Sequence, residues 1–218
     1  MKQILHVTSS PRGNASYSNR VAAQVVDELV EAHPGARVVI RDLARDPLPH
    51  IDENFSTGAY LADTDRTAGQ QASIAQSDTL IDELLAADIV VIAVAMINFA
   101  LPSTLKAWID HVARRGRTFQ YDERGPKGLV TAKKVIVVHA KGGVYSGPRQ
   151  AYDHATPYLR LVLGFLGMTD VEVIDVEGTA LGAQSADQAM ENGLNRAREI
   201  IAALAAVPPA NSLATSSA

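Results

Sequence analysis

The sequence contains no cysteine, and this absence removes a whole class of chemistry. Disulfides, thiolate metal sites, iron–sulfur clusters and cysteine nucleophiles are all excluded. Histidine is sparse, and its six residues show no H-E-x-x-H or other metal-ligand spacing. We therefore expect no metal site.

The chain also lacks an excess of basic charge and any long apolar run. Its 20 lysines and arginines face 24 acidic residues, which gives a net charge of -4 and no basic footprint for nucleic acid. The richest apolar run, from Ile89 to Leu101, is interrupted by Asn98 and is shorter than the roughly 18 to 20 residues that cross a bilayer. The N-terminus, MKQILHVTSS, lacks the length and cleavage site of a signal peptide. These features predict a cytoplasmic protein whose partners are small molecules, with neither nucleic acid nor membrane among them.

Runs rich in valine and isoleucine predict five strands. The runs are continuous rather than alternating, as in parallel strands that are covered on both faces. Helical patterns with apolar spacing of three and four lie between them. This alternation predicts an α/β fold, a flavodoxin-like doubly wound parallel sheet with helices on both faces. The predicted strands are residues 4–7, 37–40, 89–94, 135–138 and 171–176.

Two segments depart from a minimal version of this fold. Residues 44–69 show little periodicity and predict a long loop. Residues 118–121 and 128–130 flank the turn-rich ERGPKG and predict a β-hairpin inserted before the fourth strand. We expect one domain over residues 1–206, followed by a tail at 207–218 with the composition of a disordered end.

Ligands of such sheets bind beyond the carboxyl ends of the strands, where the strand order reverses. This rule selects three loops: TSSPRGNASYS at 8–18, AMINFALPS at 95–103 and AKGGVYSG at 140–147. The first loop leads into a helix whose N-cap is Ser16 or Ser18, so hydroxyls, free N–H groups and the helix dipole would converge on a phosphate monoester. It lacks both G-x-x-x-x-G-K-[ST] and G-x-G-x-x-G, which disfavours ATP and dinucleotides. A serine-rich turn with an N-cap is the alternative.

The other two loops suit a planar ring with a polar edge. Met96, Ile97 and Phe99 surround Asn98 in the second loop, although Asn98 could instead satisfy backbone groups in a core turn. In the third loop, glycines would allow close approach or positive φ, and Lys141 could place positive charge near an anion. A tight turn with an exposed lysine is the alternative there.

Several ordered motifs together carry a resemblance to a known family. They are SSPRGNASYSN, RDLARDPLP, MINF, LPSTLKAWID, GRTFQYDERGPKGLVTAKK, KGGVYSG and TPYLRLVLGFLGMTDV. Over residues 3–205 the sequence resembles the FMN-dependent NADH:quinone oxidoreductases of the bacterial azoreductase group. The resemblance implies tightly bound, non-covalent FMN, NADH or NADPH as electron donor, a quinone or azo substrate, and a homodimer with the flavin near the subunit interface.

The resemblance also implies which residues form the site. The phosphate would be held by Ser10, Ser16, Tyr17 and Ser18. The flavin ring would lie beside Met96, Ile97, Asn98 and Phe99, with Ala140, Lys141, Gly142 and Gly143 at its other polar edge. The candidates for the substrate pocket are Asn98, Phe99 and Tyr121, and no side chain is named as essential for catalysis.

The implied reaction is ping-pong: NAD(P)H gives a hydride to flavin N5 and leaves, and the acceptor then enters the same site. Ala95 and Ile97 stand where the family usually has proline and tyrosine, so the wall beside the flavin differs. Leu61 stands near an arginine of some relatives, which would weaken binding of anionic dyes. A flavodoxin-type electron carrier without NAD(P)H turnover and a flavin-free α/β regulatory module are the alternatives.

Overall fold

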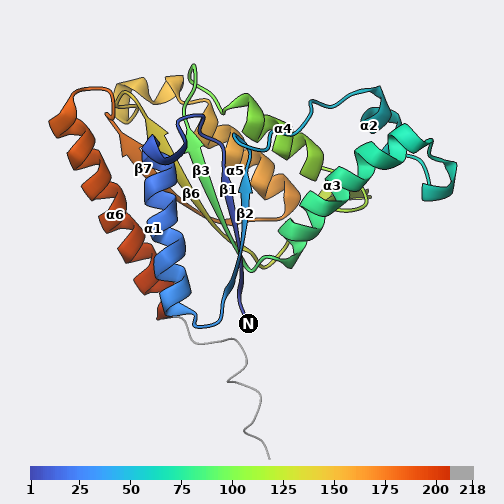
Figure 1. Cartoon of the computed structure of the whole chain (residues 1–218), viewed down its shortest axis with the longest axis horizontal. Helices are drawn as coiled ribbons and strands as arrows, with labels where there is room; N and C mark the ends of the chain where they lie inside the picture. The colour runs from blue at the N-terminus through green and yellow to red at the C-terminus, as the bar shows by residue number, and fades with distance from the viewer. Residues whose placement is uncertain (207–218) are drawn as a thin grey trace, which may run out of the picture.

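The computed structural model describes residues 1–206, so the predicted tail at 207–218 lies outside the described residues. A five-stranded parallel sheet in the order β2-β1-β3-β6-β7 forms its centre. Helices α1 and α6 cover one face, and α3, α4 and α5 cover the other (Figure 1). The elements are β1 (Gln3–Thr8), α1 (Tyr17–Ala32), β2 (Arg37–Asp42), α2 (Glu53–Gly58), α3 (Ala68–Ala86), β3 (Ile89–Ala95), α4 (Ser103–Val112), β4 (Phe119–Asp122), β5 (Gly125–Gly128), β6 (Lys134–Lys141), α5 (Ala155–Leu166), β7 (Asp170–Glu177) and α6 (Ala183–Ala205), with short 3-10 turns at Gly13–Ala15, Asp63–Asp65 and Gly147–Tyr152.

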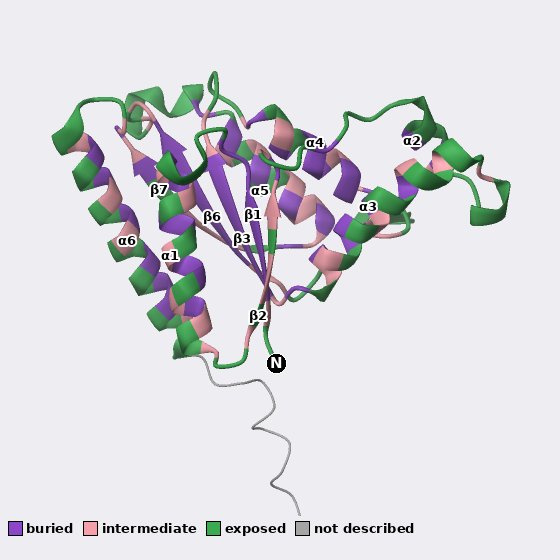
Figure 2. Ribbon diagram, in the orientation of Figure 1, coloured by how far each residue is buried: buried purple, intermediate pink, exposed green. Residues whose placement is uncertain are grey.

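All five predicted strands of the central sheet are confirmed, and so is the flavodoxin-like order. The central strands β3 and β6 are buried on both faces, which explains their unbroken apolar runs (Figure 2). Two cores result: one contains Trp108 and lies under α3, α4 and α5, and the other contains Leu29 and lies under α1 and α6. Within residues 1–206, no helix combines the length and apolarity needed to span a membrane.

The segment predicted as a long loop contains a short helix, α2. Its N-cap is Asp52, whose Oδ1 accepts a hydrogen bond from the Phe55 N–H at 2.8 Å. The Phe55 ring is buried edge-on against His111, with centroids 5.1 Å apart. A helix of six residues is too short to show periodicity, so the cap at Asp52 was its main sequence signal.

The hairpin is confirmed, but the predicted second strand is wrong by about three residues. Asp122 pairs with Gly125, so only Glu123 and Arg124 form the turn. The Asp122 carboxylate accepts the Arg124 N–H at 2.8 Å and stabilises this tight turn. Residues 129–130 instead follow the hairpin, where the Val130 N–H donates to the Leu166 carbonyl at 2.9 Å.

Close backbone contact fixes the hairpin against the end of α5. A Cβ atom on Gly128 would lie 2.2 Å from Gly167 N and 2.3 Å from Leu166 C, so no larger residue fits there.

We expect Gly128→Ala to lower the free energy of unfolding by about 2 to 3 kcal/mol through overpacking, measured by urea denaturation. Gly164→Ala in α5 is the matched control: nothing lies within 4 Å of its added Cβ, and alanine should stabilise a helix interior by about 0.5 to 1 kcal/mol. Wild-type stability for Gly128→Ala would contradict this contact.

Candidate functional site

The three predicted loops meet at one edge of the sheet. Backbone bonding continues past the strands, because the Met96 N–H donates to the Ala140 carbonyl at 2.9 Å. The Ser9 hydroxyl donates to the Ala93 carbonyl at 2.9 Å and links the first loop to β3. This edge lies at the top of the sheet in Figure 1.

The first loop forms a group of buried hydroxyls at the start of α1. Ser16 is the N-cap, and its Oγ accepts the Asn19 N–H at 3.4 Å. The Ser16 and Ser18 hydroxyls are 3.0 Å apart and buried, as is Ser10. Among the described residues, the Ser16 hydroxyl is the one hydrogen-bond partner of the Ser18 side chain. The other N–H groups of the first helical turn have no intrahelical partners, so the loop fits a phosphate.

Arg12 adds a positive charge to the first loop, a role that was not predicted from the sequence. Its guanidinium carbon lies 5.7 Å from the centroid of the Tyr17 ring, within range of a cation–π contact. Tyr17 is half-buried and Arg12 is exposed. Arginine can therefore supply at this loop the charge that a phosphate-binding lysine would supply elsewhere, and its position inside TSSPRGNASYS was the available signal.

The second loop is a two-residue turn in an unusual conformation. Ile97 and Ala100 exchange both backbone hydrogen bonds at 3.0 Å. Asn98 has φ 48° and Phe99 has φ 69°, both in the left-handed region that such turns require. That conformation costs about 1 to 2 kcal/mol for a residue with a Cβ. Asn98 is exposed, and its side chain makes no hydrogen bond within residues 1–206, so the alternative of a core-satisfying amide is not supported.

The strained turn presents an exposed aromatic side chain. Phe99 is 48% exposed, and its ring centroid lies 6.3 Å from that of Tyr145 and 5.9 Å from that of Tyr152. Met96 is half-buried and Ile97 is exposed next to it. Backbone strain that holds an apolar ring in solvent is typical of a ligand site.

In the third loop, the Lys141 side chain is buried rather than exposed. Its Nζ lies 2.7 Å from Asp175 Oδ1, 2.9 Å from Asp153 Oδ2 and 3.2 Å from Glu177 Oε1. Burial alone would lower the pKa of Lys141, but hydrogen bonds to Asp175 and Asp153 raise it above its ordinary value. The alternative of an exposed lysine is therefore wrong, and the ammonium is engaged by carboxylates of the protein itself.

The backbone of the third loop is anchored by hydrogen bonds to the segment after β7. Neither Gly142 nor Gly143 has a positive φ, so a left-handed conformation is not the reason for these glycines. The carbonyls of both accept hydrogen bonds at 2.9 Å, from Ala180 and Gly178 respectively, which anchors the loop to the segment after β7. Ala140 precedes them at the end of β6 and is buried.

A single chain does not bring Tyr121 to these loops. The His154 N–H at the start of α5 donates to the Phe99 carbonyl at 3.0 Å, whereas Gly128 of the hairpin touches the other end of α5. The 12 residues of α5 span about 18 Å. Tyr121 is 57% exposed beside Arg115, whose guanidinium carbon lies 5.9 Å from its ring centroid.

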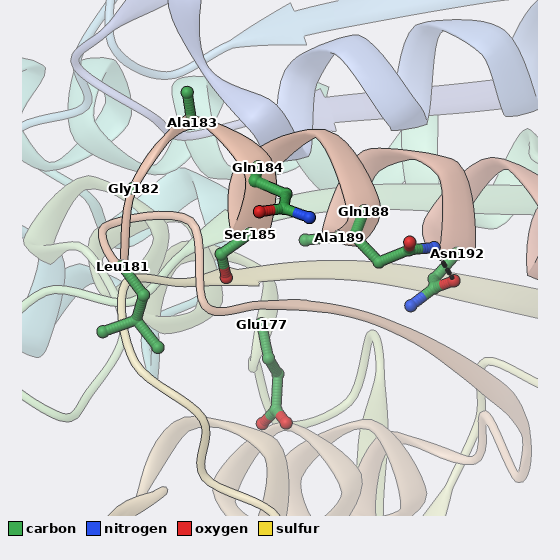
Figure 3. A pocket seen from close by; sticks show the side chains of 9 residues that line it. All are labelled: Glu177, Leu181, Gly182, Ala183, Gln184, Ser185, Gln188, Ala189 and Asn192. Atoms are coloured by element: carbon green, nitrogen blue, oxygen red, sulfur yellow. Dashed lines mark hydrogen bonds between the residues drawn. The ribbon is translucent and has the colours of Figure 1, made fainter.

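Two cavities lie near the three loops, and one of them borders the third loop. One of about 630 Å³ lies between Glu177 and the start of α6, and its lining includes the amides of Gln184, Gln188 and Asn192 (Figure 3). A second, of about 410 Å³, is lined in part by Lys141 and Tyr145. In the part of the chain that the structure describes, no three histidine or acidic side chains are placed so that they could hold a metal ion.

Two substitutions at Phe99 test the strain in the second loop. Phe99→Gly and Phe99→Ala both remove the ring, but only glycine adopts φ 69° without a steric penalty. We expect the free energy of unfolding of the glycine variant to be about 1 kcal/mol higher than that of the alanine variant. At most positions, alanine is the more stabilising of the two residues. Urea denaturation of both proteins measures this difference. Equal stability, or a more stable alanine variant, would show that the turn is unstrained.

Comparison with known proteins agrees with this geometry. Residues 2–201 match a family model described as having a flavodoxin-like fold. The chain is 50% identical over 200 residues to the FMN-dependent NADH:quinone oxidoreductase of Mesorhizobium japonicum, covering 91% of this chain and 95% of that relative. It is 53% identical over 202 residues to FMN-dependent NADH:quinone oxidoreductase 1 of Rhizobium etli, covering 92% and 98% respectively.

A solved structure is similar over the same length. The azoreductase from Bacillus anthracis str. Sterne has a TM-score of 0.85 and 31% identity, covering 92% of this chain and 99% of that one. The order of the strands, the three loops at one edge and this identity over nearly the whole length have one explanation. The chain belongs to the flavodoxin-like family of FMN-dependent NADH:quinone oxidoreductases.

Proposed function

We propose that the protein is an FMN-dependent oxidoreductase that uses NAD(P)H to reduce quinones and aromatic azo compounds. The observation that carries the proposal is the group of buried serine hydroxyls at the start of α1, next to a strained aromatic turn at the end of β3. The names of relatives about half identical to this chain support the same cofactor and donor. Residues 1–206 would form one FMN-binding domain, and the protein would act in the cytoplasm.

The phosphate of FMN would be held by the first loop. Ser10, Ser16 and Ser18 supply hydroxyls, and the first turn of α1, which begins at Tyr17, supplies N–H groups and the positive end of the helix dipole. Charge-assisted hydrogen bonds of this kind are the strong ones. One phosphate is enough to occupy the loop, which agrees with a mononucleotide.

The flavin ring would lie between the second and third loops. Met96, Ile97 and Phe99 offer apolar contacts, and the Asn98 amide and the backbone of Ala140–Gly143 offer polar ones to its edge. Bound FMN would supply the hydride chemistry, accepting at N5 from NADH or NADPH and then donating to the second substrate in a ping-pong sequence. The protein's own contribution is to orient the reactants and exclude water.

A homodimer would complete the substrate pocket. Within one chain, α5 separates Tyr121 from the Phe99 turn, yet Tyr121 is exposed on the hairpin beside the exposed Arg115. The hairpin of a second copy could therefore bring an aromatic wall to the flavin. Asn98 and Phe99 would form the rest of this pocket.

Steady-state turnover tests the activity itself. With oxygen excluded, we expect purified protein loaded with FMN to oxidise NADH or NADPH through repeated turnovers only when a quinone or azo acceptor is present, monitored at the nicotinamide absorbance. A parallel visible spectrum shows whether flavin is bound. Bound FMN without turnover would favour an electron carrier, and a colourless protein that does not take up FMN would favour a flavin-free module.

Ser18 gives a specific test of the phosphate site. Ser18→Ala leaves the Ser16 cap in place, so folding should change little, but it removes a hydroxyl expected to donate to the phosphate. A hydrogen bond to a charged group is worth about 1.5 kcal/mol or more, so the Kd for FMN should rise roughly tenfold. Flavin fluorescence quenching measures this Kd, and Ser73→Ala in α3 is the control. Unchanged FMN affinity in the Ser18 variant would refute the assignment.

A further inference from the structure

The buried ammonium of Lys141 joins the two loops that flank the expected flavin ring. We propose that Lys141 is a positioning residue that sets the geometry and the reduction potential of the flavin site without touching the flavin. This inference rests on the proposed function, because it assumes that FMN binds between the second and third loops. The cluster consists of Lys141, Asp153, Asp175 and Glu177.

One connection runs to the third loop through Glu177. Its Oε1 accepts from Lys141 Nζ at 3.2 Å and from the Tyr145 N–H at 3.1 Å. In Figure 3 the Glu177 carboxylate points away from α6. Lys141 and Tyr145 therefore both donate to the same Glu177 oxygen, and the ammonium fixes the carboxylate that binds the Tyr145 backbone.

A second connection runs to the strained turn through Asp153. Asp153 Oδ2 lies 2.9 Å from Lys141 Nζ, and its Oδ1 accepts the N–H groups of Ala155 and Thr156 at 3.0 Å. The carboxylate thus fixes the start of α5, where the His154 N–H donates to the Phe99 carbonyl at 3.0 Å. Strained turns persist only when the surrounding structure holds them, and this chain of bonds leads from Lys141 to Phe99.

Asp153 keeps its negative charge in the neutral pH range. Burial would raise the pKa of Asp153, but hydrogen bonds from Thr156 and Lys141 outweigh burial and lower it to about 2. His139 lies beside the cluster, with Nδ1 2.9 Å from the Thr156 hydroxyl. Burial, assisted by the charge of Lys141, lowers the pKa of His139 to about 3, so the imidazole is neutral. Within residues 1–206, Lys141 supplies the one ammonium that is paired with these three carboxylates.

Removal of this ammonium would act in two ways. Three carboxylates would lose their common partner, so the third loop and the start of α5 would lose their shared support. The remaining negative charge would also disfavour reduction of a nearby flavin, because reduction adds negative charge to the ring. Weaker FMN binding and a lower reduction potential should therefore appear together.

The test compares Lys141→Met, Lys141→Arg and Lys134→Met. Lys134 lies at the opposite end of β6, where its Nζ is 2.6 Å from Asp170 Oδ1, so it is a matched ion-paired control. We expect Lys141→Met to raise the Kd for FMN about tenfold and to make the potential of bound FMN, measured at saturation, more negative. Lys141→Arg should restore both toward wild type, and Lys134→Met should change neither.

The outcomes separate this inference from the proposed function. If wild type binds FMN and Lys141→Met folds with wild-type affinity and potential, the positioning role is wrong and the proposed function stands. If wild type does not bind FMN, both fail. If Lys141→Met does not fold, Glu177→Gln decides: it keeps Asp153 and Asp175 on Lys141, and we expect about a threefold higher Kd for FMN with altered visible circular dichroism of the flavin. Wild-type values in Glu177→Gln would overturn the inference.

Discussion

Parallel pairing of β1 with β3 and of β3 with β6 is the constraint on which the site depends. Thr8 lies opposite Ala93, and Ala95 lies opposite Ala140. Parallel strands end at the same edge, so loops far apart in the sequence must meet there. The hydrogen bond from Met96 N to the Ala140 carbonyl extends this pairing into the loops themselves. The position of any ligand between the second and third loops therefore depends on the hydrogen bonds that pair β3 with β6.

Local chemistry explains what could be predicted from the sequence. Continuous apolar runs marked strands that are buried on both faces, and Ser16 marked a helix start, because each signal lies within a few residues. Long-range contacts explain what was missed: the hairpin register depends on contact between Gly128 and Gly167, and the buried position of Lys141 depends on carboxylates that follow it in the chain. The fold and the meeting of the three loops at one edge of the sheet were thus predictable, whereas the side-chain partners in these loops were not.

The strained turn of the second loop is connected to the Lys141 cluster through the start of α5. Phe99 is held in a left-handed conformation with its ring about half exposed, and that conformation costs free energy. The Lys141 cluster fixes the helix start that bonds to the Phe99 carbonyl. Buried ion pairs are poor sources of stability but good sources of a unique geometry. A ligand that stacks on Phe99 would therefore meet a turn already held in shape.

The length of α5 keeps the hairpin of a chain away from the Phe99 turn of the same chain. Phe99 touches the start of this helix and the hairpin touches its end, about 18 Å away. The hairpin nevertheless exposes Tyr121 beside Arg115, an aromatic and a cation placed together at the surface. Exposed aromatics are enriched where proteins meet. A second copy whose hairpin reaches the Phe99 turn would cover both surfaces at once, so that dimer formation and completion of the substrate pocket become the same event.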